Sequence, residues 1–286
     1  MIDINVKVEV VENDPVRTYK MSTLDLQGNP MMWVSSFLID GLLIDCGHQH
    51  AKEAFFQEIA LDKVEKCVLS HHHEDHYAGA RELMEMYDIP VYATVETAYL
   101  IRLNVRIPPE RALVWGIPEP CTVKILPDIN EIKTSTSKFK LIRSPGHCNN
   151  LISIYQEETK ILFSTDAMID KNQSVIFNWE NANLMLETFK KFENLKPKYL
   201  FSSNGNVFSG VDLHHLINYW MDIKEKSAKL HSNGMKPKLI VKKIFGKESW
   251  LKVSTRGDMS RENLIRSLLN LPPIFKSRRF NKNLKK

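Results

Sequence analysis

Short apolar runs alternate with longer amphipathic stretches along most of the chain. Runs rich in β-branched and aromatic residues predict strands, and apolar residues at helical spacing predict helices. The predicted strands are residues 6–11, 36–44, 66–69, 91–94, 122–126, 139–142, 151–155, 161–164 and 199–202. The predicted helices between them are residues 50–60, 79–87, 94–105 and 181–192. This order predicts an α+β protein in which two sheets pack face to face with helices outside, an αββα four-layer sandwich.

The pattern changes after residue 210, where helical periodicity replaces the strands. Helices are predicted over residues 211–230, 237–245 and 261–271, and Ser260 is a suitable N-cap for the third. We therefore expect a main domain over residues 1–210, a small C-terminal helical unit over 211–275 and a basic, disordered tail over 276–286. Acidic residues are mixed with the basic ones in the helical unit. This favours packing on the main domain or a homodimer over nucleic-acid binding.

Length, charge and cysteine content indicate a globular protein without a membrane span or a disulfide framework. The 286 residues are 43% hydrophobic, as in a globular protein, and no apolar run is long enough to cross a membrane. The net charge is +5, but the tail over 276–286 holds six Lys or Arg residues and no acid, so the remainder carries −1. The four cysteines lack the spacing of a disulfide framework or a zinc finger. With no export signal at the amino terminus, we expect a cytoplasmic protein with a small-molecule substrate.

The densest chemistry lies in the segment Ser70-His-His-His-Glu-Asp-His76, which directly follows a predicted strand. Imidazole nitrogens and carboxylate oxygens are ligands for zinc and related ions. Alternate side chains on a turn can point to one place, so His71 and His73 are expected to converge. Asp75 and His76 follow on the next bend. The pattern His-x-His-x-Asp-His therefore predicts a site for one ion or two adjacent ions.

Three more residues lie at positions from which their side chains could reach such a site. His147 lies on a Pro-Gly turn after a predicted strand, and Asp166 ends another apolar run. Asp45 ends a third run in the same way. Each position alone is weak evidence, but in this order and beside the histidine cluster they reinforce one another.

Together these segments resemble the metallo-β-lactamase-fold hydrolases, a superfamily that includes glyoxalase II, ribonuclease Z, persulfide dioxygenase and lactonases. The resemblance covers residues 1–210, and the small helical unit after it also resembles the tail of many such hydrolases. The resemblance implies a first metal site of His71, His73 and His147, with Asp166 bridging to a second site that also contains Asp75 and His76. It implies that Asp45 orients the metal-binding loop from behind the ligands.

The chain departs from the family pattern at one position. The family usually completes its second site with a histidine after a late strand, whereas Asn204 stands there in this sequence. A carboxamide oxygen is a weaker ligand for zinc than imidazole, although it suits magnesium, calcium or manganese better. We therefore expect one tightly bound zinc ion and a second site that is weak or empty, with iron or manganese as alternatives.

These residues lead to several hypotheses for function. The first is a hydrolase in which a metal-bound hydroxide attacks an ester, thioester or lactone, with Asp75 and Asp166 as catalytic carboxylates. The alternative is a mononuclear iron oxidoreductase resembling persulfide dioxygenase, which the loss of the second-site histidine favours. A phosphodiesterase or nuclease, and a non-catalytic metal-binding relic, rank below these two. The substrate, the oligomeric state and the role of the basic tail are not determined by the sequence.

Overall fold

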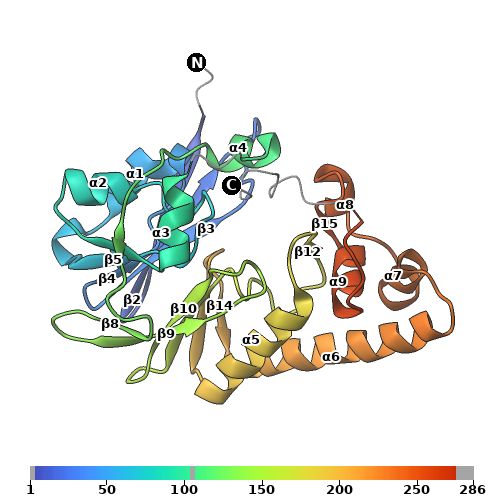
Figure 1. Ribbon diagram of the computed structural model, residues 1–286. Coiled ribbons are helices and arrows are strands. Elements are labelled where there is room, and N and C mark those ends of the chain that lie inside the picture. Colours follow the sequence, from blue (N-terminus) through green and yellow to red (C-terminus); the bar gives the residue numbers. More distant parts are fainter. Residues whose placement is uncertain (1–3, 104–106, 275–286) are drawn as a thin grey trace, which may run out of the picture.

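Two mixed sheets pack face to face, with helices on both outer faces, in the computed structural model, which describes residues 4–103 and 107–274 (Figure 1). Apolar side chains from both sheets meet between them, among them Phe37, Phe163 and Phe201. The predicted αββα four-layer sandwich is thus confirmed.

The first sheet contains the N-terminal strands and is covered by helices from the same half of the chain. Its order is β1-β2-β3-β4-β5-β6-β7, with β1–β4 antiparallel and β4–β7 parallel. The strands are β1 (Val6–Asn13), β2 (Val16–Thr23), β3 (Val34–Ile39), β4 (Leu42–Ile44), β5 (Lys66–Val68), β6 (Val91–Ala93) and β7 (Lys124–Ile125). The covering helices are α1 (Lys52–Glu58), α2 (Ala80–Glu85), α3 (Val95–Arg102) and α4 (Pro109–Trp115), with 3-10 turns at Gln49–Ala51 and Leu61–Lys63.

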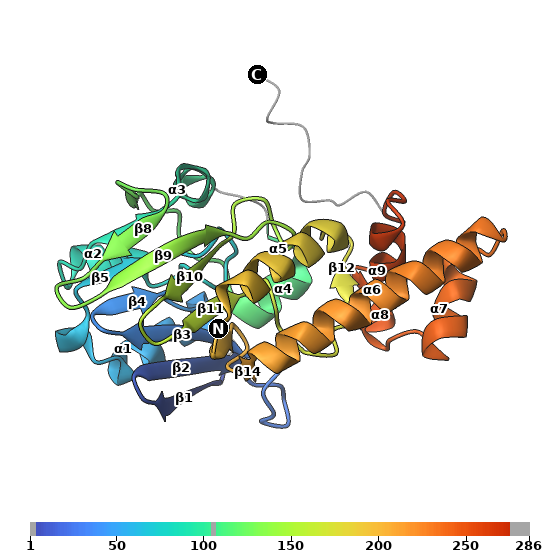
Figure 2. The ribbon, with the colours of Figure 1, turned by 90° about the horizontal axis from the view of Figure 1, so that it is seen from below.

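The second sheet is formed by the later strands, in the order β14-β13-β11-β10-β9-β8. These are β8 (Glu131–Lys133), β9 (Lys138–Arg143), β10 (Ile152–Gln156), β11 (Ile161–Thr165), β13 (Tyr199–Ser202) and β14 (Val207–Ser209). Helices α5 (Ala182–Leu195) and α6 (Gly210–Ser232) run along its outer side (Figure 2). Apolar residues from both helices and the sheet form one cluster, in which Phe189 packs edge-on against Trp220.

The C-terminal helices extend the same apolar cluster away from the sandwich. They are α6, α7 (Pro237–Phe245), α8 (Leu251–Ser254) and α9 (Arg261–Leu268). A capping box at Ser209 and Asp212 fixes the start of α6. The short strands β12 (Ile176–Phe177) and β15 (Met259–Ser260) pair with each other, which attaches the start of α9 to the segment before α5.

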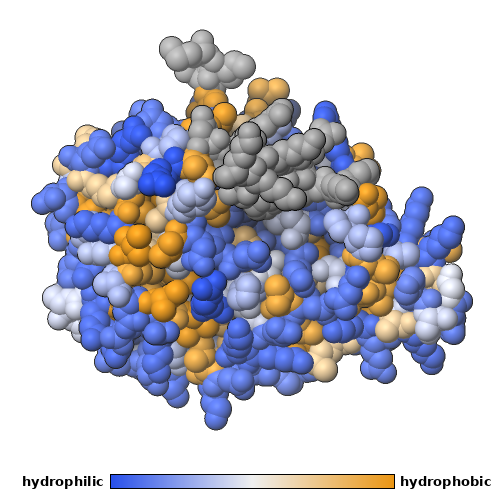
Figure 3. Space-filling model, viewed as in Figure 1, coloured by the Kyte–Doolittle hydropathy of each residue, from blue (hydrophilic) through white to orange (hydrophobic). Residues whose placement is uncertain are grey.

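Hydrophilic residues cover most of the face seen in Figure 3, and apolar residues form only scattered patches there. Among the described residues, no helix combines the length and the apolar character needed to cross a membrane.

The predicted elements differ from the observed ones in a few places. Residues 36–44 were expected as one strand but form the β3–β4 hairpin, because Asp40 and Gly41 both have positive φ and reverse the chain. β2 and α4 were not predicted. The third C-terminal helix ends at Leu268 and not at residue 271. The predicted basic tail over 276–286 lies outside the described residues.

Candidate metal centre

The candidate ligands lie where parallel strands end. β4 pairs in parallel with β5, and β11 pairs in parallel with β13, so the loops after these strands emerge at the same edge of their sheets. Asp45 follows β4, and the histidine cluster follows β5. Asp166 follows β11 directly. Asp45 and Thr165 have positive φ values of 60° and 47°, so the chain turns sharply at both strand ends.

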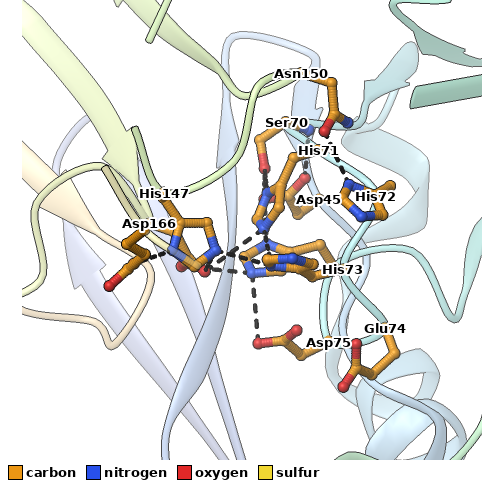
Figure 4. A network of polar contacts seen from close by, with 12 residues as sticks. Asp45, Ser70, His71, His72, His73, Glu74, Asp75, His147, Asn150 and Asp166 are labelled. Atoms are coloured by element: carbon orange, nitrogen blue, oxygen red, sulfur yellow. Dashed lines mark hydrogen bonds and ion pairs between the residues drawn. The ribbon is translucent and has the colours of Figure 1, made fainter. Parts of the chain in front are cut away.

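Asp45 holds the histidine cluster in place through hydrogen bonds. Its side chain is 1% exposed, and its two oxygens accept from the Ser70 backbone N–H and the Ser70 hydroxyl, both at 2.7 Å. Its Oδ2 also lies 2.7 Å from His76 Nδ1. Figure 4 shows Asp45 beside Ser70 and His71. A carboxylate here can only accept, so His76 carries its proton on Nδ1. When the ring is neutral, Nε2 is therefore the lone-pair donor, and it points into the centre.

The tautomer of His71 follows from its hydrogen bonds in the same way. The Ser70 hydroxyl donates to Asp45, so its oxygen accepts a hydrogen bond from His71 Nδ1–H, 3.0 Å away. His71 Nε2 therefore faces the centre with a lone pair. It lies 3.0 Å from His73 Nδ1 and 3.5 Å from Asp166 Oδ2.

His147 reaches the centre from the turn between β9 and β10. Gly146, at φ +138°, packs against the start of α5. His147 Nδ1 lies 2.5 Å from Glu180 Oε1, while Glu180 Oε2 accepts from the Phe177 backbone N–H at 2.7 Å. Glu180 thus fixes the His147 tautomer as Asp45 fixes that of His76. His147 Nε2 lies 2.8 Å from His73 Nδ1 and 3.1 Å from Asp166 Oδ2.

The predicted ligands form two overlapping groups. In each group the ligand atoms lie within 4.8 Å of one another. The first group is His71, His73, His147 and Asp166, and the second is Asp75, His76 and Asp166. In the second group, His76 Nε2 is 3.5 Å from oxygens of both Asp75 and Asp166 and has no hydrogen-bond partner among the described residues.

Both ends of the Asn204 carboxamide are bonded to backbone, one in the turn between β13 and β14 and one in the loop after β11. Its side-chain N–H₂ donates to the Ile169 carbonyl at 2.9 Å, and its Oδ1 accepts from the Asn206 backbone N–H at 3.1 Å. His214 and His215, farther along on α6, bond to Glu193 and Asn172 on the surface. Asp75, His76 and Asp166 are therefore the second-group ligands that the structure brings together.

Burial and charge set the protonation of these groups. Burial lowers the pKa of His71 to about 3, and burial together with neighbouring imidazoles lowers that of His73 well below its usual range. Burial raises the pKa of Asp166, but His76 and His147 outweigh it and hold the pKa well below normal. Burial lowers the pKa of His76, but Asp75, Asp166 and Asp45 together raise it well above normal.

This arrangement fits a divalent cation. The first group offers three imidazole nitrogens and an ionised carboxylate, the donor set that zinc takes in open sites. His71 Nε2 and His147 Nε2 each lie near 3 Å from His73 Nδ1. An ion shared by these three nitrogens would satisfy them better than hydrogen bonds between the rings. The strong field of Asp75 and Asp166 at the unpartnered His76 Nε2 also favours a cation.

Several supporting residues were not predicted. Glu180 on the loop before α5 and Arg111 on α4 both contact the ligand region. Phe177 and Trp179 stack at 4.2 Å, and their ring centres lie 6.5 Å from those of His147 and His73, respectively. Their signal in the sequence is faint. Asn181, which directly follows Glu180, is the N-cap of α5. The pair Pro108-Pro109 predicts the start of a helix, and Arg111 lies in the first turn of that helix.

A polar pocket of about 530 Å³ lies beside the centre, between the loop before α5 and helix α9. Trp179 and Glu180, which contact ligand histidines, form part of its wall. The remainder of the wall comes from side-chain amides, one arginine, a hydroxyl and two prolines: Asn178, Asn181, Asn263, Asn270, Arg266, Ser267, Leu271, Pro272 and Pro273.

The sequence comparisons agree with the geometry. A family model described as the metallo-beta-lactamase superfamily matches residues 34–203. The chain is 23% identical over 211 residues to the probable metallo-hydrolase YflN of Bacillus subtilis, a match that covers 64% of this chain and 76% of YflN. It is 28% identical over 115 residues to a hydroxyacylglutathione hydrolase of Pectobacterium carotovorum, covering 40% of this chain.

The matched lengths limit what these relatives imply. The chain spans 60% of an uncharacterized protein of Aquifex aeolicus, at 24% identity over 129 residues and 45% of this chain. It spans only 37% of the Pectobacterium enzyme.

The solved structures resemble the whole fold. A beta-lactamase domain protein from Burkholderia ambifaria superposes with a TM-score of 0.65 at 15% identity, covering 91% of this chain and 87% of that one. A metallo-beta-lactamase family protein from Thermus thermophilus gives 0.58 at 15% identity, covering 88% of this chain and 90% of that one. These likenesses concern the fold.

Proposed function

This chain belongs to the metallo-beta-lactamase superfamily, and we propose that it is a metal-dependent hydrolase that cleaves an ester, thioester or lactone. The observation that carries the proposal is the convergence of His71, His73, His147 and Asp166 within 4.8 Å. The names of two relatives, a probable metallo-hydrolase and a hydrolase of an acylated glutathione, support the reaction class.

We assign zinc to the first group, because three imidazoles and a carboxylate suit it best. The second group offers one imidazole and two carboxylates, since the Asn204 carboxamide is bonded to the backbone at Ile169 and Asn206. One tightly held ion and a weak or empty second group follow from this difference.

Each residue then has a definite task. A divalent ion bound by the first group supplies a polarised substrate carbonyl and a water of lowered pKa. His71, His73 and His147 would bind it, while Asp45 holds His71 through the Ser70 hydroxyl and Glu180 holds His147. Asp166 reaches both groups. Asp75 Oδ2 accepts the proton of the attacking water, and the stacked rings of Phe177 and Trp179 exclude bulk solvent.

We place the non-reacting part of the substrate in the polar pocket beside Trp179 and Glu180. Its amide side chains and Arg266 suit a ligand with carbonyl or carboxylate groups. Remote contacts of this kind orient the reacting carbonyl towards the centre.

A small panel of ester, thioester and lactone substrates tests the proposal. Wild-type protein is assayed before and after chelation, and His147→Ala is assayed beside it. We expect chelation and the substitution each to lower kcat/KM by at least about a hundredfold, since the first group loses its ion. Unchanged cleavage by His147→Ala would contradict the metal-dependent reaction.

The second candidate is an iron-dependent oxidoreductase resembling persulfide dioxygenase. The hydrogen bonds of Asn204 to the backbone at Ile169 and Asn206 support it, because a one-ion centre suits oxygen chemistry as well as hydrolysis. Iron content with oxygen uptake on a glutathione persulfide would favour this candidate. Zinc content with metal-dependent thioester cleavage would count against it.

We further propose a cytoplasmic location, supported by four cysteines that are all unpaired. The capped start of α6 at Gly210 supports a boundary between the catalytic domain and the helical unit at residues 210–211. The homodimer remains a prediction.

A further inference from the structure

Arg111 crosses from α4 to the metal-ligand loop. Its Nε pairs with Glu74 Oε1, and its Nη2 lies 3.3 Å from Asp75 Oδ1. The side chain is only 13% exposed. The guanidinium carbon lies 5.9 Å from each of the Phe177 and Trp179 rings, which cover it on another side. Arg111 is therefore a buried cation fixed by two carboxylates and two aromatic rings.

The contact with Asp75 places this cation beside the second ligand group. One oxygen of Asp75 faces Arg111, and the other lies 3.5 Å from His76 Nε2. A carboxylate held at one oxygen by a guanidinium has less negative charge to offer another cation at the other oxygen. Asp166, which belongs to both groups, also interacts electrostatically with Arg111.

From this geometry we infer that Arg111 occupies the electrostatic role of a second metal ion. It positions Asp75 and disfavours a second divalent ion in the group of Asp75, His76 and Asp166. The inference rests on the proposed function, in which the first group holds an ion. It gives a second reason why the centre binds only one ion, and this reason does not depend on Asn204. The second group lacks a histidine and also lies beside a fixed positive charge.

The energetics support this role. A divalent ion brought close to a buried cation is repelled, and the surrounding protein screens this repulsion less than water does. A purely structural ion pair with Glu74 would not require the contact with Asp75. The planar guanidinium, however, reaches both acids at once, as a lysine ammonium on its more flexible stem does less readily.

Titration of a second zinc ion tests the inference. Wild type, Arg111→Gln and Arg111→Lys are loaded with one zinc ion, and the dissociation constant of the next ion is measured by competition with a chromophoric chelator. We expect Arg111→Gln to bind the second ion at least about tenfold more tightly, because the repulsion is removed. Arg111→Lys, which keeps the charge, should stay within about threefold of wild type. The exposed Arg81→Gln, which loses the same charge on the surface, serves as the matched control.

A second variant separates the charge of Arg111 from that of Glu74. Glu74→Gln/Arg111→Gln removes both charges, keeps the net charge and avoids an unpaired buried carboxylate if the single variant folds poorly. We expect it also to tighten the second ion. A second-ion affinity unchanged in this double variant, or tightened equally in Arg111→Lys, would overturn the inference. A wild type whose first group binds no ion would instead contradict the proposed function.

Discussion

At the scale of single residues, the centre depends on carboxylates that are not themselves ligands of the first group. Asp45 and Glu180 each bond to an imidazole Nδ1 and thereby direct its Nε2 inwards. Both acids are buried, at 1% and 8% exposed. A histidine ring free to rotate or change tautomer would bind an ion less tightly.

Removal of the Glu180 charge tests this support directly. In Glu180→Gln the amide presents either an N–H or a weaker acceptor to His147 Nδ1, so the ring is less firmly held. We expect the affinity for the first zinc ion to fall by about 10- to 100-fold, measured by chelator competition. Glu187→Gln, on the exposed side of α5, is the control and should match wild type. An affinity loss of less than about threefold in Glu180→Gln would show that Glu180 does not support the ligand.

The candidate ligands and Asp45 could be predicted from the sequence, but Glu180 and Arg111 could not. His71, His73, Asp75 and His76 lie within six residues, and their spacing alone brings them together. Glu180 is 33 residues from His147, and Arg111 is 36 from Asp75. Such contacts depend on how a loop and a helix pack across the site, and no local periodicity encodes that packing.

At the scale of elements, strand ends and tight turns carry the site. The long apolar strands and amphipathic helices were predictable, because burial imposes a period on the sequence. Strands β12 and β15 contain two residues each, too few to establish a period. The hairpin at Asp40-Gly41 lies inside a continuous apolar run, so the reversal there was missed.

The turn that carries His147 requires a glycine at position 146. Gly146 has φ +138°, and an added Cβ would lie 2.6 Å from the Met185 backbone nitrogen. We expect Gly146→Ala to lower the free energy of unfolding by more than about 2 kcal/mol and to weaken zinc binding. Gly234→Ala, where φ is also positive but the space is open, should cost about 1 kcal/mol and leave zinc binding intact. Denaturant unfolding of both variants measures the difference, and equal costs would refute the steric argument.

At the scale of the whole molecule, the two sheets and the C-terminal helices contribute different parts of the centre. The first sheet supplies the loop of His71 to His76, and the second supplies His147 and Asp166. The β12–β15 pairing attaches α9 to the loop that carries Trp179 and Glu180. The polar pocket therefore forms only when the helical unit is in place.

A substitution on α9 tests whether this pocket serves the substrate. Arg266 lines it and donates from Nε to the Pro272 carbonyl at 2.7 Å. We expect Arg266→Met to raise KM severalfold with a smaller effect on kcat, because it removes binding contacts distant from the reacting bond. Arg143→Met, on the exposed part of β9, is the control. An unchanged KM in Arg266→Met would place the substrate elsewhere.

The most direct test of the central claim is an anomalous difference map, recorded at the zinc edge, from crystals of protein purified without added chelator. The account predicts one strong peak among His71 Nε2, His73, His147 Nε2 and Asp166, with weak or no density between Asp75 and His76. Two peaks of equal strength would contradict the one-ion centre, and no peak at the first group would contradict the metal-dependent function.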